Sequence, residues 1–451
     1  MNKAVNGALT LAITTLAGMS TAQPVASVTA PASAVVSGAE AQASAHLRTL
    51  VLVSVDRSPA VREAQSNWRA ANQEILQSRA GLWPRIELSA NSGAARLESG
   101  GPGMASASLG VTATYTVMDH GRQQRQIEAR GLQAASLAQQ VLVAGENNAF
   151  ETVTAYLQMI KQQRLIRIYE RHIAELSSLV DKLTATVRVF VGRRSELTQA
   201  RARLEQTRDA LLGVKARETE YALILRRQVG VAASGLPNAL PALPQDQVNL
   251  LVEEAAQQHP AMRAARAESA ALRTRLAEIQ AGQKPFLDLQ ASKQTGTDAY
   301  GFGSPAQVYL TAKWLAFDGD AGKAEVGALL ERARSADDKA DQLLFTIAHQ
   351  IQAAHADFEA QTRRIEVLGQ LIDGTDQVRR DMFDQWRELG RRSLLEVLTA
   401  ESEHLTTQLN LASSEVDQVL ALARMRHEAG SLAAWLLPAN HPLAAGAERT
   451  D

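Results

Sequence analysis

The sequence contains one structural plan twice, and this internal duplication restricts its possible folds more than any other feature. The segment SPAVREA at 58–64 is matched by HPAMRAA at 259–265, and WPRIEL at 83–88 is matched by KPFLDL at 284–289. The tetrapeptide GRRS occurs at 192–195 and again at 390–393. These offsets are close to 200 residues, whereas solenoid and propeller repeats are only about 20 to 50 residues long. Each half is therefore one large unit, and the two halves share one architecture.

The N-terminus has the pattern of an export signal. Residues 1–22 combine Lys3, an apolar run and the small residues STA at 20–22, which predicts a cleaved signal peptide. Residues 23–46 are rich in Ala, Ser, Val and Pro, and we expect a disordered leader there. No later stretch has 18 consecutive apolar residues, so we predict no transmembrane helix. An exported chain of this type is periplasmic, secreted or inserted in the outer membrane as β-structure.

The composition excludes several classes of function. The 47 basic and 48 acidic residues give a net charge of −1, so there is no electrostatic basis for binding nucleic acid. The chain has no cysteine, which excludes disulfides and an N-terminal lipid-bearing cysteine. His349 and His355 do not share a helical face, so we expect no metal site and no cofactor. The chain lacks a nucleophile–base pattern and a phosphate loop, which indicates that it is not an enzyme.

Two tracts without proline, 103–236 and 306–437, predict very long helices, because an interior proline costs about 3 kcal/mol. Apolar residues recur at alternating intervals of three and four, as at Leu344, Ile347, Ile351, Ala354 and Phe358. This spacing is typical of a coiled-coil seam and also of an ordinary buried bundle face. The stretches 119–191 and 318–389 each have about 70 residues, or roughly 100 Å of helix, and this length favours coiled coils.

The GRRS motif interrupts each long tract once. Its glycine, Gly192 or Gly390, is suited to the left-handed residue that ends a helix. Its serine, Ser195 or Ser393, is suited to the N-cap of the returning helix. Each half is therefore predicted to contain an antiparallel helical hairpin with GRRS at its tip.

A β-hairpin is predicted ahead of each helical hairpin. Residues 105–117 alternate between apolar and small polar side chains, 86–90 form the paired strand, and the second half repeats this at 287–291 and 308–314. Transmembrane barrels have about eight strands or more, so closure would need several copies of the chain. Tyr115 and Trp314 end the apolar strand faces and are predicted to be membrane-interface aromatics. The alternative is a soluble β-hairpin that packs on helices.

Taken in order, these features resemble the TolC-like outer-membrane channels of type I secretion and tripartite efflux. The likeness rests on the duplicated order of strand and helix hairpins, on the segments that begin at Ser58 and His259, and on the two GRRS tips; it covers about residues 47–432. It implies a mainly α fold with a transmembrane β-barrel portion, in which long antiparallel coiled-coil hairpins form an α-barrel. Each protomer contributes four strands, and a homotrimer forms a 12-stranded barrel.

This plan gives the expected domain boundaries. The first repeat is expected at 47–236, with strands at about 84–118 and a helical hairpin at about 119–229. The second repeat is expected at 237–432, with strands at about 285–317 and a helical hairpin at about 318–432. Residues 433–451 form a C-terminal tail.

The resemblance also implies which residues carry function. Adaptor docking is expected at the two periplasmic tips, which comprise Gly192, Arg193, Arg194, Ser195, Gly390, Arg391, Arg392 and Ser393. Gate or pore roles are expected for Arg392, Glu396 and Glu196, because family members pair a tip arginine with nearby acids. Thr399 stands where a second acid is found in the family, so one acidic ring is expected to be missing. The alternative is that these arginines are solvated charges favoured near helix C-termini.

The implied function is an outer-membrane channel of a type I secretion system in a Gram-negative bacterium. It would work with a periplasmic adaptor of the membrane-fusion type and an inner-membrane ABC or proton-driven transporter, and its barrel would contact outer-membrane lipid. The missing lipid-anchor cysteine and the second tip sequence favour protein export over drug or small-molecule efflux, which is the alternative. A periplasmic coiled-coil structural protein is the alternative of another class, and the apolar strand faces argue against it.

Overall fold

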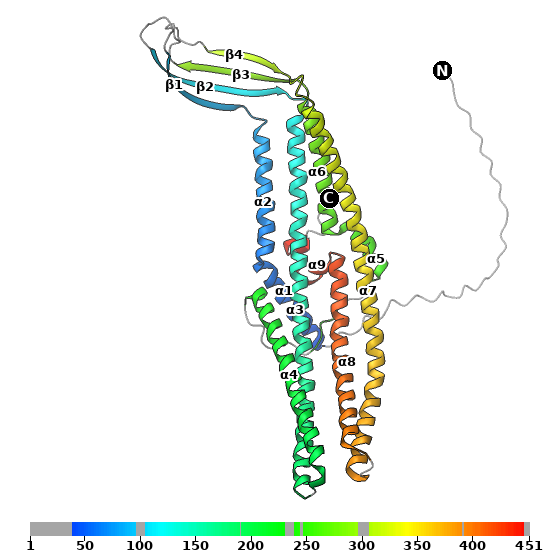
Figure 1. Ribbon diagram of the computed structural model, residues 1–451. Coiled ribbons are helices and arrows are strands. Elements are labelled where there is room, and N and C mark those ends of the chain that lie inside the picture. Colours follow the sequence, from blue (N-terminus) through cyan, green and yellow to red (C-terminus); the bar gives the residue numbers. More distant parts are fainter. Residues whose placement is uncertain are drawn as a thin grey trace, which may run out of the picture. The chain divides into compact units, whose positions relative to one another are not determined.

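The computed structural model describes residues 38–95, 104–189, 191–230, 239–243, 247–295, 306–389 and 392–445 (Figure 1). The predicted signal peptide lies outside the described residues, as do Gly390 and Arg391. The first series of elements is α1 (Gly38–Arg57), α2 (Pro59–Ala80), β1 (Arg85–Ala95), β2 (Met104–Met118), α3 (Arg122–Val189) and α4 (Arg194–Val229). The second is α5 (Val248–Gln258), α6 (Pro260–Gly282), β3 (Phe286–Thr295), β4 (Gln307–Lys313), α7 (Ala321–Leu389) and α8 (Leu394–Glu428). The duplicated sequence thus folds into the same order of elements twice.

The repeated Ser-Pro or His-Pro dipeptide marks the start of a helix in both halves. The Ser58 hydroxyl accepts a hydrogen bond from the Val61 N–H at 3.4 Å, and Pro59 opens α2. His259 Nδ1 accepts from the Ala261 N–H at 3.1 Å, and Pro260 opens α6. Proline is favoured in the first turn of a helix because the N–H groups there have no acceptor within the helix, so the N–H that proline lacks is not needed.

Helix α1 begins at Gly38, so the prediction of a disordered leader is wrong for residues 38–46. Ala43 and Leu47 are fully buried, and the Tyr156 hydroxyl of α3 lies 3.5 Å from the Ala43 carbonyl oxygen. Alanine has the highest intrinsic helix propensity. The Ala-rich segment therefore becomes helical once α3 offers a surface on which it is buried, and composition alone does not reveal that surface.

The C-terminal segment also packs on α3. It contains the short helices α9 (Leu432–Leu436) and α10 (Pro442–Ala445), and Leu432, Leu436 and Leu443 are buried in the core cluster that includes Tyr156. A Cβ atom at Gly145 of α3 would lie 2.6 Å from Leu443 Cδ1. An alanine at this position would therefore require the Leu443 side chain to move.

The four strands form one antiparallel sheet in the order β1-β2-β3-β4 (Figure 1). Leu88 is paired with Val111, Tyr115 with Leu289, and Leu289 with Leu310, so these apolar side chains share one face. All of them are exposed, from 40% for Leu289 to 78% for Leu88. On the other face the Thr116 hydroxyl donates to Asp288 Oδ1 at 2.9 Å. The sheet therefore has an exposed apolar face and a polar face, as the alternation predicted.

The long helices α3 and α7 have 68 and 69 residues, close to the predicted length. They run from the sheet to the hairpin tips, where α4 and α8 turn back alongside them (Figure 1). None of the described helices combines the length and the apolar character needed to cross a bilayer. The helices thus separate the sheet from the tips, and the candidate site lies at and near the tips.

Candidate functional site

A helix cap shapes the tip of the second hairpin. The Ser393 hydroxyl accepts from the Glu396 N–H at 3.4 Å, and the Glu396 carboxylate accepts from the Ser393 N–H at 2.9 Å. Together these bonds form a capping box, in which two otherwise unpaired backbone N–H groups are satisfied. The bond from the Ser393 N–H, followed by that from Arg392, holds the pKa of Glu396 below its usual value. Ser393 therefore has its predicted N-cap position.

Arg392 connects the two helices of this tip. Its Nη1 donates to Glu396 Oε1 at 3.0 Å, and its Nε donates to Gln385 Oε1 of α7 at 3.1 Å. The side chains of Arg392 and Glu396 are 40% and 46% exposed, and exposed pairs of this kind contribute only ~0–1 kcal/mol. The structure thus brings two of the predicted gate residues together within a single tip.

The first hairpin turns differently from the prediction. A single 3₁₀ turn, η1 (Val191–Arg193), joins α3 to α4. The φ angle of Gly192 is not in the left-handed region, and the N-cap of α4 is Arg193, whose side chain makes no capping bond. Predicting Gly192 as the left-handed residue and Ser195 as the N-cap was therefore wrong, because the 3₁₀ turn lets α4 begin before Ser195.

The two tips share a small hydrophobic core. Trp386 of α7 is 7% exposed and belongs to a buried cluster to which α3, α4 and α8 contribute Leu176, Leu179, Leu183, Leu197, Ala200, Leu204, Leu394, Val397 and Leu398. The Arg193 guanidinium lies 5.7 Å from the centroid of the Trp386 ring, which is within cation–π range. The predicted tip residue Arg193 therefore contacts the second hairpin through an aromatic ring.

The remaining residues of the first tip have fewer contacts. Arg194 is exposed, and Glu196 is half-buried. Glu196 Oε2 is buried and has no hydrogen-bond partner within the described part of the chain. The structure does not pair Glu196 with Arg392, and the gate role proposed for it remains a prediction.

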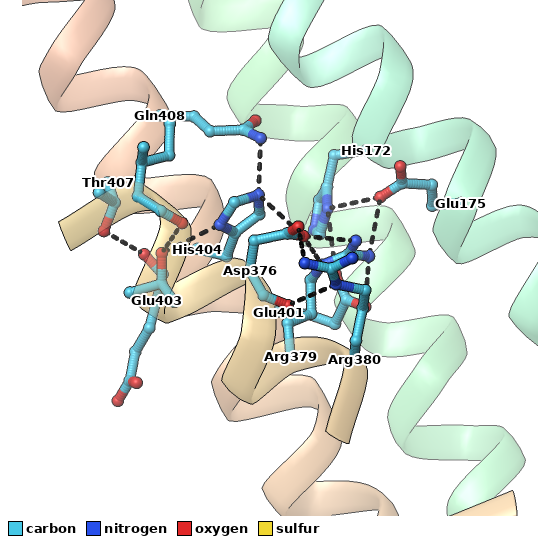
Figure 2. A network of polar contacts seen from close by, with 12 residues as sticks. His172, Glu175, Asp376, Arg379, Arg380, Glu401, Glu403, His404, Thr407 and Gln408 are labelled. Carbon is cyan, nitrogen blue, oxygen red and sulfur yellow. Dashed lines mark hydrogen bonds and ion pairs between the residues drawn. The ribbon is translucent and has the colours of Figure 1, made fainter. Parts of the chain in front are cut away.

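A polar network lies further along the helices and joins the two hairpins (Figure 2). At its centre Arg379 of α7 donates to Asp376 Oδ1 at 2.8 Å and to Glu401 Oε1 of α8 at 3.3 Å. Arg379 Nη1 also lies 3.9 Å from Glu175 Oε2 of α3. Burial raises the pKa of Glu401, although the Arg379 charge opposes the shift. Three helices from both repeats therefore contribute charges to one cluster.

Two histidines extend this network. His404 of α8 lies 3.0 Å from the Thr375 hydroxyl through Nδ1 and 2.7 Å from Gln408 Nε2 through Nε2. His172 of α3 is buried, and its Nδ1 lies 3.9 Å from Glu175 Oε2 and 4.0 Å from Glu401 Oε2. Burial lowers the pKa of His172 to about 4, so its imidazole is neutral at physiological pH.

Sequence reasoning did not find this network. Only the three-residue spacing of His172 and Glu175, which places both on one face of α3, was visible beforehand. The partners Arg379 and Glu401 are more than 200 residues away in the chain. Their proximity follows from the register of α3 against α7 and α8, which the heptad spacing does not specify.

Two further ion pairs join α3 to α8. Lys161 Nζ lies 2.8 Å from Asp417 Oδ2, and Arg164 Nη1 lies 2.7 Å from Glu415 Oε2. The Lys161 and Asp417 side chains are only 19% and 30% exposed. The first and second hairpins are therefore connected at several levels by charged side chains.

The predicted membrane-interface aromatics, Tyr115 and Trp314, lie at the end of the strands that is next to the helices. Tyr115 is in β2, and Trp314 directly follows β4. They are 42% and 62% exposed, and Trp314 Nε1 donates to the Gln283 carbonyl oxygen at the end of α6 at 3.2 Å. Their membrane role remains a prediction.

Known proteins match this arrangement. The outer membrane efflux protein family matches residues 53–231. The outer membrane efflux protein BepC of Brucella suis is 23% identical over 303 residues, which are 64% of each chain, and protein CyaE of Bordetella pertussis is 24% identical over 319 residues, which are 67% of each. The crystal structure of the outer membrane protein VceC from Vibrio cholerae has a TM-score of 0.75 and 18% identity, covering 86% of this chain and 96% of that one. The chain thus spans slightly less than two thirds of the length of BepC.

The duplicated sheet and helical hairpins have the fold of solved outer-membrane channel structures. Residues 53–231 match the outer membrane efflux protein family, and the chain is similar to TolC-like channels in sequence and in fold. Members of this family are outer-membrane channels and not enzymes. They act with adaptors and inner-membrane transporters.

Proposed function

We propose that three copies of this chain form the outer-membrane conduit of a type I secretion system. The observation that carries the proposal is the sheet: β1 and β4 are its outer strands, and within the described part of the chain each has one edge without a strand partner. Unpaired edges are not tolerated in lipid, so β1 of one copy pairs with β4 of the next until the ring closes. The exposed apolar face, with Leu88, Val111 and Leu310, then faces lipid.

The helical tips are the proposed entrance and docking end. We assign adaptor docking to residues 192–195 and 390–393, and the gate to Arg392, Glu396 and Glu196. The exposed Arg392–Glu396 pair contributes only ~0–1 kcal/mol within its own tip, so Arg392 can exchange it for a contact with a neighbouring copy, and three such weak contacts would form a latch that a partner readily opens. Tyr115 and Trp314 are assigned to the membrane interface.

Protein export is favoured over small-molecule efflux by two sequence features. The chain has no cysteine that could carry a lipid anchor, and its second tip resembles that of channels paired with type I exporters. Drug or small-molecule efflux is the second candidate, because BepC, one of the matched relatives, is named an efflux protein.

The assembly is tested by the mass of the detergent-extracted outer-membrane protein, determined by light scattering and on gels of unheated and heated samples. A heat-sensitive trimer in the outer-membrane fraction is expected, and a periplasmic monomer would overturn the proposal. The cargo is tested by comparing a strain that lacks the chain with one that carries it again. Loss of specific secreted proteins supports type I secretion, whereas increased sensitivity to drugs with an unchanged secretome supports efflux.

A further inference from the structure

We propose that His172, Glu175 and Glu401 form a Zn²⁺ site that connects α3 of the first hairpin to α8 of the second. The three side chains each offer one ligand atom, and these atoms all lie within 4.8 Å of one another (Figure 2). Imidazole nitrogen and carboxylate oxygen atoms are both donors that bind zinc in proteins. The site goes beyond the channel function and was not expected from the sequence.

The spacing of the donors is close to that of a metal site. Donors at 2.0–2.1 Å from a tetrahedral zinc ion are separated from each other by roughly 3.4 Å. His172 Nδ1 is 3.9 Å from Glu175 Oε2 and 4.0 Å from Glu401 Oε2. These distances are too long for hydrogen bonds. The three donor atoms lie within 4.8 Å of one another, so their separations would have to shorten by about 0.5 to 1.4 Å to surround one ion, and rotation of the exposed Glu175 side chain can supply this change.

His172 is the observation that points to a ligand. It is 6% exposed, and its Nε2 has no hydrogen-bond partner within the described part of the chain. Its other ring nitrogen faces two carboxylates without bonding to either. A buried imidazole normally makes hydrogen bonds.

Arg379 contacts the same carboxylates as the proposed ion, but it does not occupy the position of the ion. Its closest bond, 2.8 Å, is to Asp376 on its own helix. It reaches Glu401 through Oε1, whereas the Oε2 of the same carboxylate faces His172. Only Glu175 Oε2 lies at a similar distance from both groups, 3.9 Å in each case. Arg379 is therefore expected to weaken metal binding by electrostatic repulsion without blocking it.

An ion can reach the site from solvent. Glu175, Arg379 and Glu401 line an open cavity of about 640 Å³, and His172 lines a neighbouring cavity of about 340 Å³ with Glu175 and His404. Water from these cavities can supply the fourth ligand of the ion. Because Glu175 and Glu401 come from different repeats, bound Zn²⁺ would hold the two hairpins together. This last consequence rests on the proposed function, whereas the binding itself does not.

The test uses the full-length protein in detergent, stripped of metal with EDTA and titrated with Zn²⁺ against a chromophoric chelator. We expect one Zn²⁺ per chain and a loss of affinity of at least about tenfold in His172→Gln and in Glu401→Gln. Arg379→Gln should bind more tightly than the wild type. The control is His355→Gln, because His355 lies 3.9 Å from Glu359 on the surface of α7 and has no third donor among the described residues, and it should bind like the wild type.

Three results would overturn the site. They are the absence of stoichiometric binding to the wild type, equal weakening in His355→Gln, and weaker binding in Arg379→Gln. Unchanged heat-sensitive oligomers and circular dichroism show that each variant is folded. Co²⁺ provides a measurement on the wild type alone: visible absorption bands of a four-coordinate nitrogen and oxygen site are expected, and a spectrum identical to free Co²⁺ would contradict the proposal. Failure of this test leaves the channel assembly untouched.

Discussion

Arg392 and Glu396 pair within one turn of the same tip, with 3.0 Å between Nη1 and Oε1. The same carboxylate accepts from the Ser393 N–H at 2.9 Å through its second oxygen. Glu396 is thus a helix cap as well as an ion-pair partner. Any latch formed by Arg392 across the assembly competes with this local pair, so the latch would consist of weak polar contacts.

Reversing the charge at both tips should open the entrance. In Arg194→Glu combined with Arg392→Glu, the second substitution faces Glu396 and replaces an attraction of ~0–1 kcal/mol by a repulsion of similar size in each chain. We expect a higher single-channel conductance in planar bilayers. The control is Arg363→Glu, which changes an exposed i,i+4 pair with Glu359 elsewhere on α7. Unchanged conductance in the double variant would eliminate the latch.

Trp386 should be the main stabilising residue of the tips. It is 7% exposed in the shared core, and truncation of a buried tryptophan to alanine costs about 3–5 kcal/mol. Trp386→Ala should therefore increase amide hydrogen exchange in both tips. Trp386→Phe should have a much smaller effect, because Trp386 Nε1 makes no hydrogen bond within the described residues. If amide hydrogen exchange in the tips is the same in the wild type and in both variants, the stability of the tips does not depend on this core.

The architecture was predictable because its signals are local and occur twice. The proline-free tracts predicted α3 and α7 to within a few residues, and the alternation at 105–117 predicted β2 and its apolar face. The features that were predicted wrongly or missed depend on tertiary contacts. The helix at 38–46 is stabilised by burial against Tyr156, and the 3₁₀ turn at Gly192 replaces a left-handed turn that the identical GRRS tetrapeptide suggested. The network around Arg379 requires the register of three helices, which no local pattern encodes.

The pair formed by Lys161 and Asp417 should contribute more to stability than an exposed pair of the same length. Its side chains are 19% and 30% exposed, whereas those of Lys215 and Glu170, also 2.8 Å apart, are 47% and 51% exposed. A double-mutant cycle with Lys161→Gln and Asp417→Asn should give a coupling energy of about 1 kcal/mol, since less solvent screens the charges. The same cycle with Lys215→Gln and Glu170→Gln should give about 0.5 kcal/mol or less. Equal couplings in thermal unfolding would refute this difference.

Glu146 should make the attachment of the C-terminal segment depend on pH. Its Oε1 accepts from the Ala433 N–H of α9 at 3.0 Å, and burial raises its pKa from 4.5 to about 8 in spite of this bond. Since the folded chain binds the proton more tightly than the unfolded chain, the stabilisation is complete below about pH 4.5 and is lost as the pH rises through about 8.

Glu146→Gln keeps the acceptor and removes the titration, so its stability should vary less with pH than that of the wild type. The variant should be the more stable protein above pH 8 by up to about 5 kcal/mol. The measurement is the unfolding midpoint from pH 4 to 9, together with hydrogen exchange in α9. Glu128→Gln, an exposed substitution on the same helix, is the control and should follow the wild-type profile. Parallel profiles for Glu146→Gln and the wild type would mean that Glu146 does not titrate in this range, and the segment would then be held on α3 by its apolar contacts alone.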